Sequence, residues 1–271
     1  MTDPNNAGER AEAVQANGLS IGYSVRGFGP PLVLIHGAEG SRDMFTEFGT
    51  ALAAHFTVIA YDQRDTGATR DLADPPRDYG LADLGDDVAA LIKALGHDRA
   101  HVFGTSLGGL IAQVFAARHP GCLDRLVLSS TFMAGRSLLE LNPRVAEQMS
   151  VWRADPARYA PEIATKFFPA EYLRAHPDRI DMFRGGRRTV DQTKRRARLL
   201  GAPYSIGEHE IRNRTLLLMA DQDELIPNAA TLAVAAIVHE PRIEVITGVG
   251  HIAAIQAPAK LARAVVAFLE S

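Results

Sequence analysis

The most informative stretch of the sequence is Gly104-Thr105-Ser106-Leu107-Gly108, which joins an apolar run to a helical pattern over 107–118. Glycines two residues before and two residues after Ser106 allow a sharp strand-to-helix turn in which the serine adopts strained dihedral angles and exposes its hydroxyl. The helix dipole and the free N–H groups at the start of the helix favour negative charge there. The pattern predicts a nucleophilic serine, and an ordinary glycine-rich turn is the other interpretation.

A serine becomes a good nucleophile only beside a general base that a third residue orients. In enzymes with such an elbow, the acid and then the histidine follow the serine along the chain. His251 comes directly after the last predicted strand, and Asp221, Asp223 and Glu224 come after the strand before it. We prefer Asp223, because Pro227 stands four residues later in a turn that directs the carboxylate across the sheet.

Acyl transfer also needs two preorganised N–H donors for the developing oxyanion. The backbone N–H of Leu107, directly after the serine, is one expected donor. The loop after an early apolar run begins His36-Gly37-Ala38 and is expected to supply the other from Ala38. Gly37 would let the backbone approach the site closely. We expect His36 to shape this loop through a hydrogen bond rather than to take part in the reaction.

The elements that must position these residues follow an alternating order. Short apolar runs are mostly continuous, which is typical of strands covered on both faces of a parallel sheet. They lie at 32–35, 57–61, 100–104, 125–129, 215–220 and 243–247. Helical patterns between them, at 81–95, 107–118 and 256–270, predict a doubly wound, mostly parallel α/β sheet. Asn17-Gly18 ahead of them predicts a hairpin turn.

The strand–helix alternation stops between residues 133 and 209, where the sequence is rich in Arg, Pro and aromatic residues and shows no strand run. We therefore predict a core made of 13–132 and 210–271, interrupted by an inserted helical cap or lid over 133–209. The polar, acidic start of the chain predicts a disordered tail over residues 1–12.

Aromatic residues and methionines of the predicted lid are candidates for an apolar pocket over Ser106. They are Met133, Trp152, Phe167, Phe168 and Met182, and packing of the lid onto the sheet is the alternative for most of them. Residues 184–198 hold seven basic residues and one acidic residue. Two interpretations of this basic stretch stay open: a site for an acidic group of the substrate, or a solvated helix face.

Taken together and in this order, the motifs resemble the α/β-hydrolase fold family. The matching stretches are His36-Gly37, Tyr61-Asp62-Gln63-Arg64, Gly104-x-Ser106-x-Gly108-Gly109, Asp223-x-x-x-Pro227 and Gly250-His251. The resemblance covers the chain outside residues 1–12 and, loosely, the lid. It implies a triad of Ser106, Asp223 and His251, with Leu107 and Ala38 as oxyanion donors.

One departure from the family pattern follows the predicted strand at 57–61. Arg64-Asp65-Thr66-Gly67 stands where the family usually has Arg-Gly-x-Gly. This version resembles a subgroup that contains methylesterases of polyketide antibiotics. The serine at position 106 argues against the dehalogenase and epoxide hydrolase branches, which attack with a carboxylate.

These residues lead to the hypothesis of a serine hydrolase that cleaves an ester or lactone of a small, largely apolar molecule through an acyl-enzyme. Such a reaction needs no metal and no organic cofactor. The same triad also serves C–C bond hydrolases, enol-lactonases, perhydrolases and hydroxynitrile lyases, which stay open as alternatives. A ligand receptor that retains the triad is the alternative from a different class.

The composition of the chain limits the classes of partner that we expect it to bind. Lys and Arg number 29 against 32 Asp and Glu, a formal net charge of −3, which argues against a nucleic-acid or anionic-membrane binder. No apolar stretch approaches the roughly 20 residues of a membrane span, and the N-terminus lacks a signal-peptide pattern. The single cysteine, Cys122, excludes an internal disulfide. We expect a cytoplasmic protein acting on a small molecule, with its oligomeric state open.

Overall fold

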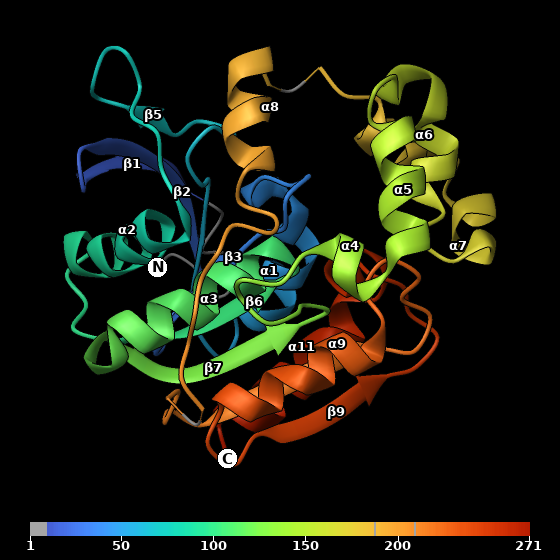
Figure 1. Cartoon of the computed structure of the whole chain (residues 1–271). Coiled ribbons are helices and arrows are strands. Elements are labelled where there is room, and N and C mark those ends of the chain that lie inside the picture. The colour runs from blue at the N-terminus through green and yellow to red at the C-terminus, as the bar shows by residue number, and fades with distance from the viewer. Residues whose placement is uncertain (1–9, 187, 209) are drawn as a thin grey trace, which may run out of the picture.

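The computed structural model of the chain describes residues 10–186, 188–208 and 210–271. Within these residues nine strands form one mostly parallel sheet in the order β1-β2-β4-β3-β6-β7-β8-β9, with β5 paired to β2 (Figure 1). The strands are β1 (Arg10–Ala16), β2 (Leu19–Arg26), β3 (Pro31–Ile35), β4 (Thr57–Tyr61), β5 (Arg70–Asp71), β6 (Ala100–Thr105), β7 (Leu123–Ser129), β8 (Thr215–Ala220) and β9 (Arg242–Ile246). The predicted doubly wound α/β fold is confirmed.

The sheet begins with the antiparallel hairpin of β1 and β2, which turns at Asn17 (φ 49°) and Gly18 (φ 72°) as predicted. The prediction of a disordered tail over 1–12 is wrong for residues 10–12, which belong to β1 and pair with β2. Their mixed polar and alanine sequence hides a strand whose backbone is satisfied by pairing, and the Tyr23 hydroxyl donates to Glu12 Oε2 at 2.8 Å. Residues 1–9 lie outside the described residues.

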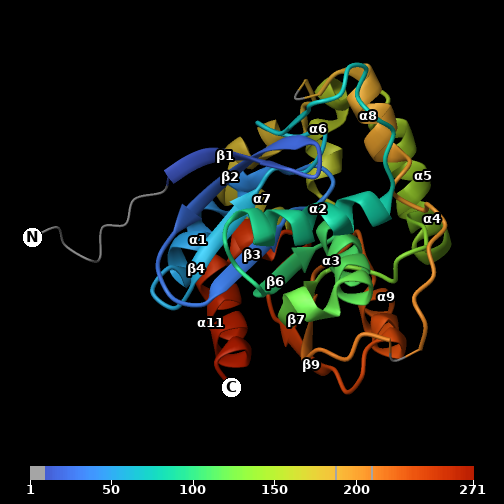
Figure 2. The ribbon, with the colours of Figure 1, turned by 90° about the vertical axis from the view of Figure 1, so that its left-hand side faces the viewer.

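Helices cover both faces of the sheet (Figure 2). The helices α2 (Leu81–Ala94) and α3 (Leu107–Arg118) pack on one face, and α1 (Thr46–Leu52) and α11 (Pro258–Leu269) pack on the other. Successive side chains of β3 alternate between these layers: Val33 and Ile35 join the first apolar core, whereas Leu32 and Leu34 join the second. Burial on both faces explains why the parallel strands are continuously apolar in sequence.

Short helical elements that the sequence pattern did not predict fill the connections outside the segment between β7 and β8. They are the 3-10 helices η1 (Arg42–Phe45), η2 (Pro120–Cys122) and η4 (Val234–Ile237) and the helices α1, α9 (Asn228–Ala233) and α10 (Ala253–Gln256). Each has seven residues or fewer, which is too short to show a helical period in sequence.

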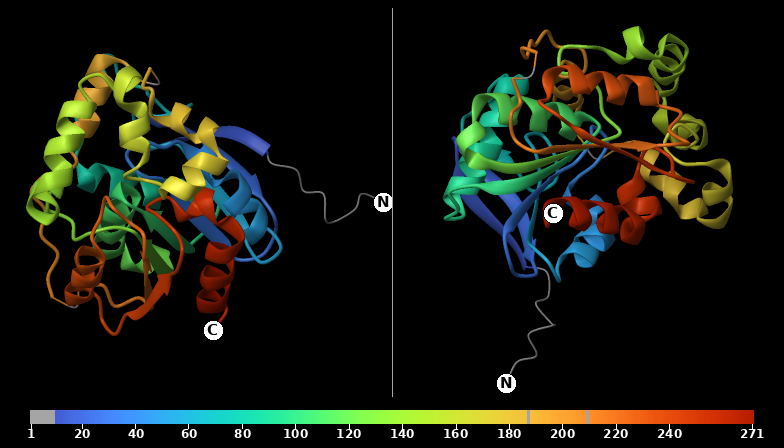
Figure 3. Two further views of the ribbon diagram at one scale, coloured as in Figure 1. Left: turned by 90° about the vertical axis from the view of Figure 1, so that its right-hand side faces the viewer. Right: turned by 90° about the horizontal axis from the view of Figure 1, so that it is seen from below.

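The segment between β7 and β8, here called the insertion (residues 133–209), contains helices and no strand among its described residues. They are α4 (Leu138–Leu141), α5 (Pro143–Trp152), α6 (Pro156–Ala164), α7 (Ala170–Ala175), the 3-10 helix η3 (Pro177–Phe183) and α8 (Val190–Ala197). They gather at one side of the sheet (Figures 1 and 3). No helix in the described part of the chain is long and apolar enough to cross a membrane.

Candidate active site

Ser106 stands in the sharp turn between β6 and α3, with φ 55° and ψ −124°. A left-handed φ is strained for a residue with a side chain, and such strain persists only where the surroundings enforce it. A Cβ on Gly108 would lie 2.1 Å from the Ile35 carbonyl oxygen, and a Cβ on Gly104 would lie 2.4 Å from that of Gly108. Both positions therefore accept only glycine, which is why this turn leaves a readable sequence pattern.

His251 and Asp223 meet in the interior, 28 residues apart in the chain. Nδ1 of His251 lies 2.8 Å from Oδ2 of Asp223, and their side chains are 2% and 1% exposed. The other carboxylate oxygen, Oδ1, accepts the backbone N–H groups of Leu225 and Ile226, both at 2.9 Å. These contacts fix the carboxylate, so that the imidazole donates through Nδ1 and keeps Nε2 as its acceptor.

The Nε2 atom of His251 is buried, and no hydrogen-bond partner for it exists within the described residues. Unpartnered buried polar atoms are rare in folded proteins, and each one calls for an explanation. His251 lines the same cavity as Ser106. A base whose outer nitrogen is free in a cavity that a partly exposed serine also lines has the arrangement that serine activation needs.

The two other acids that the sequence left open have different contacts. Oδ1 of Asp221 accepts the backbone N–H of Val249 at 3.2 Å, so this side chain caps the loop before the histidine. Glu224 pairs with Lys166 of the insertion at 2.7 Å. Within the described residues, Asp223 is the one of these three acids that bonds to His251.

Residues 36–40, here called the oxyanion loop, pass directly beside the serine: a Cβ on Gly37 would lie 3.3 Å from the Ser106 Cβ. Nδ1 of His36 lies 2.8 Å from the Gly37 carbonyl oxygen. Because C=O and N–H of a trans peptide point in opposite directions, this bond also sets the direction of the Ala38 N–H. His36 shapes the loop in the way that the sequence suggested.

Burial lowers the pKa of His36 to about 3, and the charge of Arg196 acts in the same direction. The ring is therefore neutral at physiological pH. Its Nε2 lies 3.4 Å from the Gln63 backbone nitrogen and 3.3 Å from Thr66 Oγ1, so it serves as an acceptor and Nδ1 carries the proton. The second expected donor, Leu107, is the first residue of α3, where an N–H has no acceptor within the helix.

The cavity beside Ser106 has a volume of about 60 Å³ and is bounded by both the sheet side and the insertion. Of the five pocket candidates, Phe167 and Met182 line it. The other three pack elsewhere: Phe168 is buried in the apolar core, and Met133 and Trp152 lie partly buried against that core. Neighbours in sequence such as Phe167 and Phe168 leave the chain in different directions, so composition alone could not separate them.

Several lining residues carried no expectation from the sequence. The apolar ones are Met44, Phe132, Leu138, Leu200, Leu225, Ile226 and Ile252, and Phe183, an aromatic residue of the predicted lid, lines the cavity with them. The charged ones are Glu39 and Arg153, which form an ion pair at 2.6 Å between the oxyanion loop and the insertion. Glu39 stands inside a recognised motif and could have been found there, whereas nothing in the sequence singles out Arg153.

Glu39 carries a negative charge next to the expected donor Ala38. Burial raises the pKa of this carboxyl, but Arg153, Arg188 and Arg196 outweigh burial and hold the pKa below its ordinary value. The wall of the cavity therefore combines an apolar surface with one ionised carboxylate of the oxyanion loop, whose charge is balanced by nearby arginines.

The basic stretch 184–198 divides between a solvated face and contacts with the core. Arg184, Lys194 and Arg198 are exposed, as the solvated-face interpretation expects, whereas Arg188, Arg195 and Arg196 contact the core. Arg195 binds both carboxylate oxygens of Asp65, at 2.7 and 2.8 Å. Arg196 is buried and donates to Gln63 Oε1 at 2.9 Å and to the Arg64 carbonyl at 3.0 Å. These arginines dock the insertion onto the turn after β4 rather than facing solvent.

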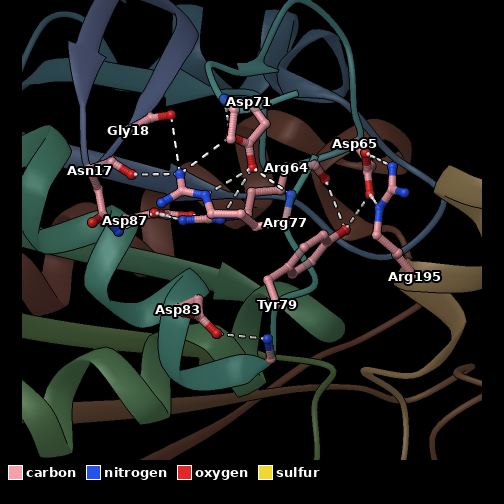
Figure 4. Close-up of polar contacts among 12 residues, drawn as sticks. Asn17, Gly18, Arg64, Asp65, Asp71, Arg77, Tyr79, Asp83, Asp87 and Arg195 are labelled. Atoms are coloured by element: carbon pink, nitrogen blue, oxygen red, sulfur yellow. Dashed lines mark hydrogen bonds and ion pairs between the residues drawn. The ribbon is translucent and has the colours of Figure 1, made fainter. Parts of the chain in front are cut away.

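The turn that receives them explains the departure from the usual motif. Asp65 adopts φ 59°, a conformation that favours glycine, and its side chain lies between Arg195 and the Tyr79 hydroxyl (Figure 4). Arg64 points the other way and makes a buried two-point contact with Asp87 at 2.7 and 2.8 Å. The pair Arg64-Asp65 thus ties the insertion to α2.

Comparisons with known proteins agree with this architecture. A family model described as alpha/beta hydrolase fold matches residues 30–258. The Agrobacterium fabrum protein named "Putative carbamate hydrolase RutD" is 29% identical over 219 residues, which is 76% of this chain and 80% of that protein.

Two solved structures show the same fold. The enol-lactonase from Burkholderia xenovorans LB400 is 24% identical, with 96% of this chain and 100% of that one covered and a TM-score of 0.79. The carboxylesterase CesB from Bacillus subtilis is 21% identical, with 98% and 93% covered and a TM-score of 0.80. Because the family model spans most of the sequence, the chain belongs to the alpha/beta hydrolase fold family.

Proposed function

We propose that the protein is a serine hydrolase that cleaves carboxylic esters or lactones of small, largely apolar molecules. The observation that carries the proposal is the buried His251–Asp223 pair, whose free Nε2 belongs to a residue lining the same cavity as the strained Ser106. Most buried polar side-chain atoms in folded proteins have a hydrogen-bond partner, so a free Nε2 at the cavity is consistent with a base that awaits a proton.

In the proposed reaction, Ser106 Oγ attacks the substrate carbonyl while His251 Nε2 takes the hydroxyl proton. The oxyanion of the tetrahedral intermediate receives hydrogen bonds from the Leu107 and Ala38 N–H groups. The intermediate collapses as His251 returns the proton to the leaving alcohol, which departs and leaves an acyl-serine. A water molecule, deprotonated by His251, then attacks the acyl-serine, and the second tetrahedral intermediate releases the carboxylic acid as His251 returns this proton to Ser106 Oγ. Asp223 keeps the imidazole in the productive tautomer throughout.

The surroundings of the serine suggest a substrate with two unlike ends. The cavity of about 60 Å³ holds only a small apolar group. A wider hollow of about 720 Å³ adjoins it, since Gly40, Met44 and Met182 line both. Charged side chains, among them Asp43 and Arg179, line the hollow. We expect the short end of the substrate beside Ser106 and the larger, more polar end outside.

The test is labelling of the folded protein with a fluorophosphonate, with the modified peptide identified by mass spectrometry. We expect modification of Ser106 in the wild type and none in Ser106→Ala. A panel of p-nitrophenyl esters of increasing acyl length, with lactones alongside, should show turnover that falls as the acyl chain outgrows the cavity. An unlabelled Ser106, or a Ser106→Ala variant that retains full ester hydrolysis, contradicts the proposal.

Carbamate hydrolysis is a second candidate, favoured by the likeness to RutD over four fifths of that protein's length. The chemistry is the same attack on a carbonyl carbon, which in a carbamate bears nitrogen in place of carbon on its acyl side. An aryl carbamate added to the ester panel separates the two. Faster turnover of the carbamate than of the matched ester would favour this candidate.

A further inference from the structure

We propose that Arg188 of the insertion is a positioning residue of the oxyanion loop, and that it holds the Ala38 N–H in the orientation that an oxyanion requires. This inference rests on the proposed function, because a donor needs positioning only if an oxyanion forms. The nucleophile, the base and the acid all lie outside the insertion, so the proposal gives the insertion a part in the reaction itself.

The guanidinium of Arg188 bridges two segments of the core through three backbone oxygens. Its Nη2 donates to the carbonyls of Ala38, at 2.8 Å, and Gly40, at 3.3 Å. Its Nε donates to the carbonyl of Asp65 at 3.2 Å. A planar fork with donors in fixed directions suits this task better than a single ammonium group, which presents one centre.

These contacts complete a set of restraints around the Ala38 N–H. On one side, His36 fixes the peptide between Gly37 and Ala38. On the other side, Arg188 fixes the next peptide through the Ala38 carbonyl. The backbone N–H of Gly40 bonds to the Gly37 carbonyl at 3.3 Å and closes the turn. With glycine at positions 37 and 40, the loop has wide conformational freedom, so an outside restraint on its carbonyls matters.

Charge adds to the argument. The oxyanion loop carries the anionic Glu39 directly after Ala38, and a carboxylate near a developing oxyanion opposes it. Arg153 pairs with that carboxylate at 2.6 Å, and Arg188 adds a second cation on the same loop. The insertion thereby supplies the positive charge that makes a glutamate tolerable beside the site.

Arg195 offers a matched control within the same stretch. It also docks the insertion onto the core, and it does so through both carboxylate oxygens of Asp65. Its bonds to the core are made to that side chain, whereas Arg188 bonds to the carbonyls of the oxyanion loop. Loss of either arginine weakens docking, but only loss of Arg188 releases the loop.

The experiment compares Arg188→Met, Arg188→Lys and Arg195→Met with the wild type, using p-nitrophenyl acetate. A donor lost from an oxyanion hole costs about 10²–10³ in kcat, so a displaced donor should cost about 30–100-fold in Arg188→Met, with KM within about threefold. A boronic acid that forms a tetrahedral adduct with Ser106 should bind more weakly by a similar factor. Arg188→Lys should recover part of kcat, and Arg195→Met should change kcat by less than about threefold.

The outcomes distinguish a failure of the positioning role of Arg188 from a failure of the proposed function. Equal loss of kcat in Arg188→Met and Arg195→Met, or an Arg188→Met effect confined to KM or to the melting temperature, overturns the role of Arg188. The rate of fluorophosphonate labelling gives an independent reading. A wild type that is never labelled at Ser106 overturns the proposed function itself, whereas labelling at equal rates in wild type and Arg188→Met overturns only the positioning role.

Discussion

The elbow around Ser106 and the docking face of the insertion, which is formed by Arg188, Arg195 and Arg196, are held in place by different interactions. The elbow is set by backbone geometry. Glycine is required at 104 and 108 because backbone oxygens leave no room for a Cβ there. The insertion is set by arginine side chains that reach backbone oxygens and Asp65 across more than a hundred residues of sequence. The first region should tolerate almost no change, whereas the second should lose its function in graded steps.

The sharpest test of the rigid region is Ser106→Ala. We expect kcat for ester hydrolysis to fall by about 10⁵–10⁶-fold, because the proposed acyl-enzyme forms on the Ser106 hydroxyl. The melting temperature should stay at or above that of the wild type, since alanine removes no hydrogen bond that holds the elbow backbone. A residual activity within tenfold of the wild type would place the nucleophile elsewhere.

Asp223→Asn should lower kcat by about 10³–10⁴-fold, because the amide can donate to His251 Nδ1 and so stabilises the wrong tautomer. Asp221→Asn and Glu224→Gln are the matched controls. Asp221 caps a loop and Glu224 pairs with Lys166, so both should keep kcat within about threefold, as expected for groups outside the reaction. A larger loss in either control than in Asp223→Asn would show that the acid has been misassigned.

The difference between the two regions also explains what the sequence could foretell. Strand runs, the elbow and the acid turn are local patterns, and the structure places Ser106, Asp223 and His251 where those patterns suggested. The arginine contacts of 188, 195 and 196 depend on which residues of two distant segments come face to face, and no local pattern encodes that. The same limit applies to the pocket wall, where Phe167 and Met182 line the cavity and Met133, Trp152 and Phe168 do not.

The lowered pKa of His36 makes the stability of the folded chain depend on pH. Its pKa falls from 6.5 to about 3 in the folded chain, so the unfolded chain binds one more proton between these values and the folded state loses stability as the pH drops. From about pH 8 to about pH 5 the loss amounts to roughly 2 kcal/mol, with a slope that approaches 1.36 kcal/mol per pH unit below pH 6.5.

The comparison variant is His36→Asn, which keeps a donor near the position of Nδ1 but does not titrate. Urea unfolding at several pH values should give a flatter curve for the variant, with the difference between the two proteins shrinking by about 2 kcal/mol toward about pH 5. Parallel curves for the two proteins would mean that folding does not lower the pKa of His36.

The smallest expected effect belongs to the docking face. A double-mutant cycle of Asp65→Asn and Arg195→Gln should give a coupling energy of about 1–2 kcal/mol, because the pair is mostly buried and bonded at two points. Urea unfolding of the four proteins measures it. A coupling near zero would mean that the remaining contacts, such as those of Arg196, dock the insertion without this pair.

The order of the site residues along the chain has a consequence for how activity arises during synthesis. The ribosome makes the elbow of Ser106 first, then the whole insertion, and only afterwards the strands β8 and β9 with the loops that carry Asp223 and His251. Because β8 pairs with β7 and β9 with β8, these strands extend a sheet edge that is already complete up to β7. With the proposed roles of Ser106 and His251, a nascent chain carries its nucleophile long before its base, and hydrolysis begins only after residue 251 has been translated and folded.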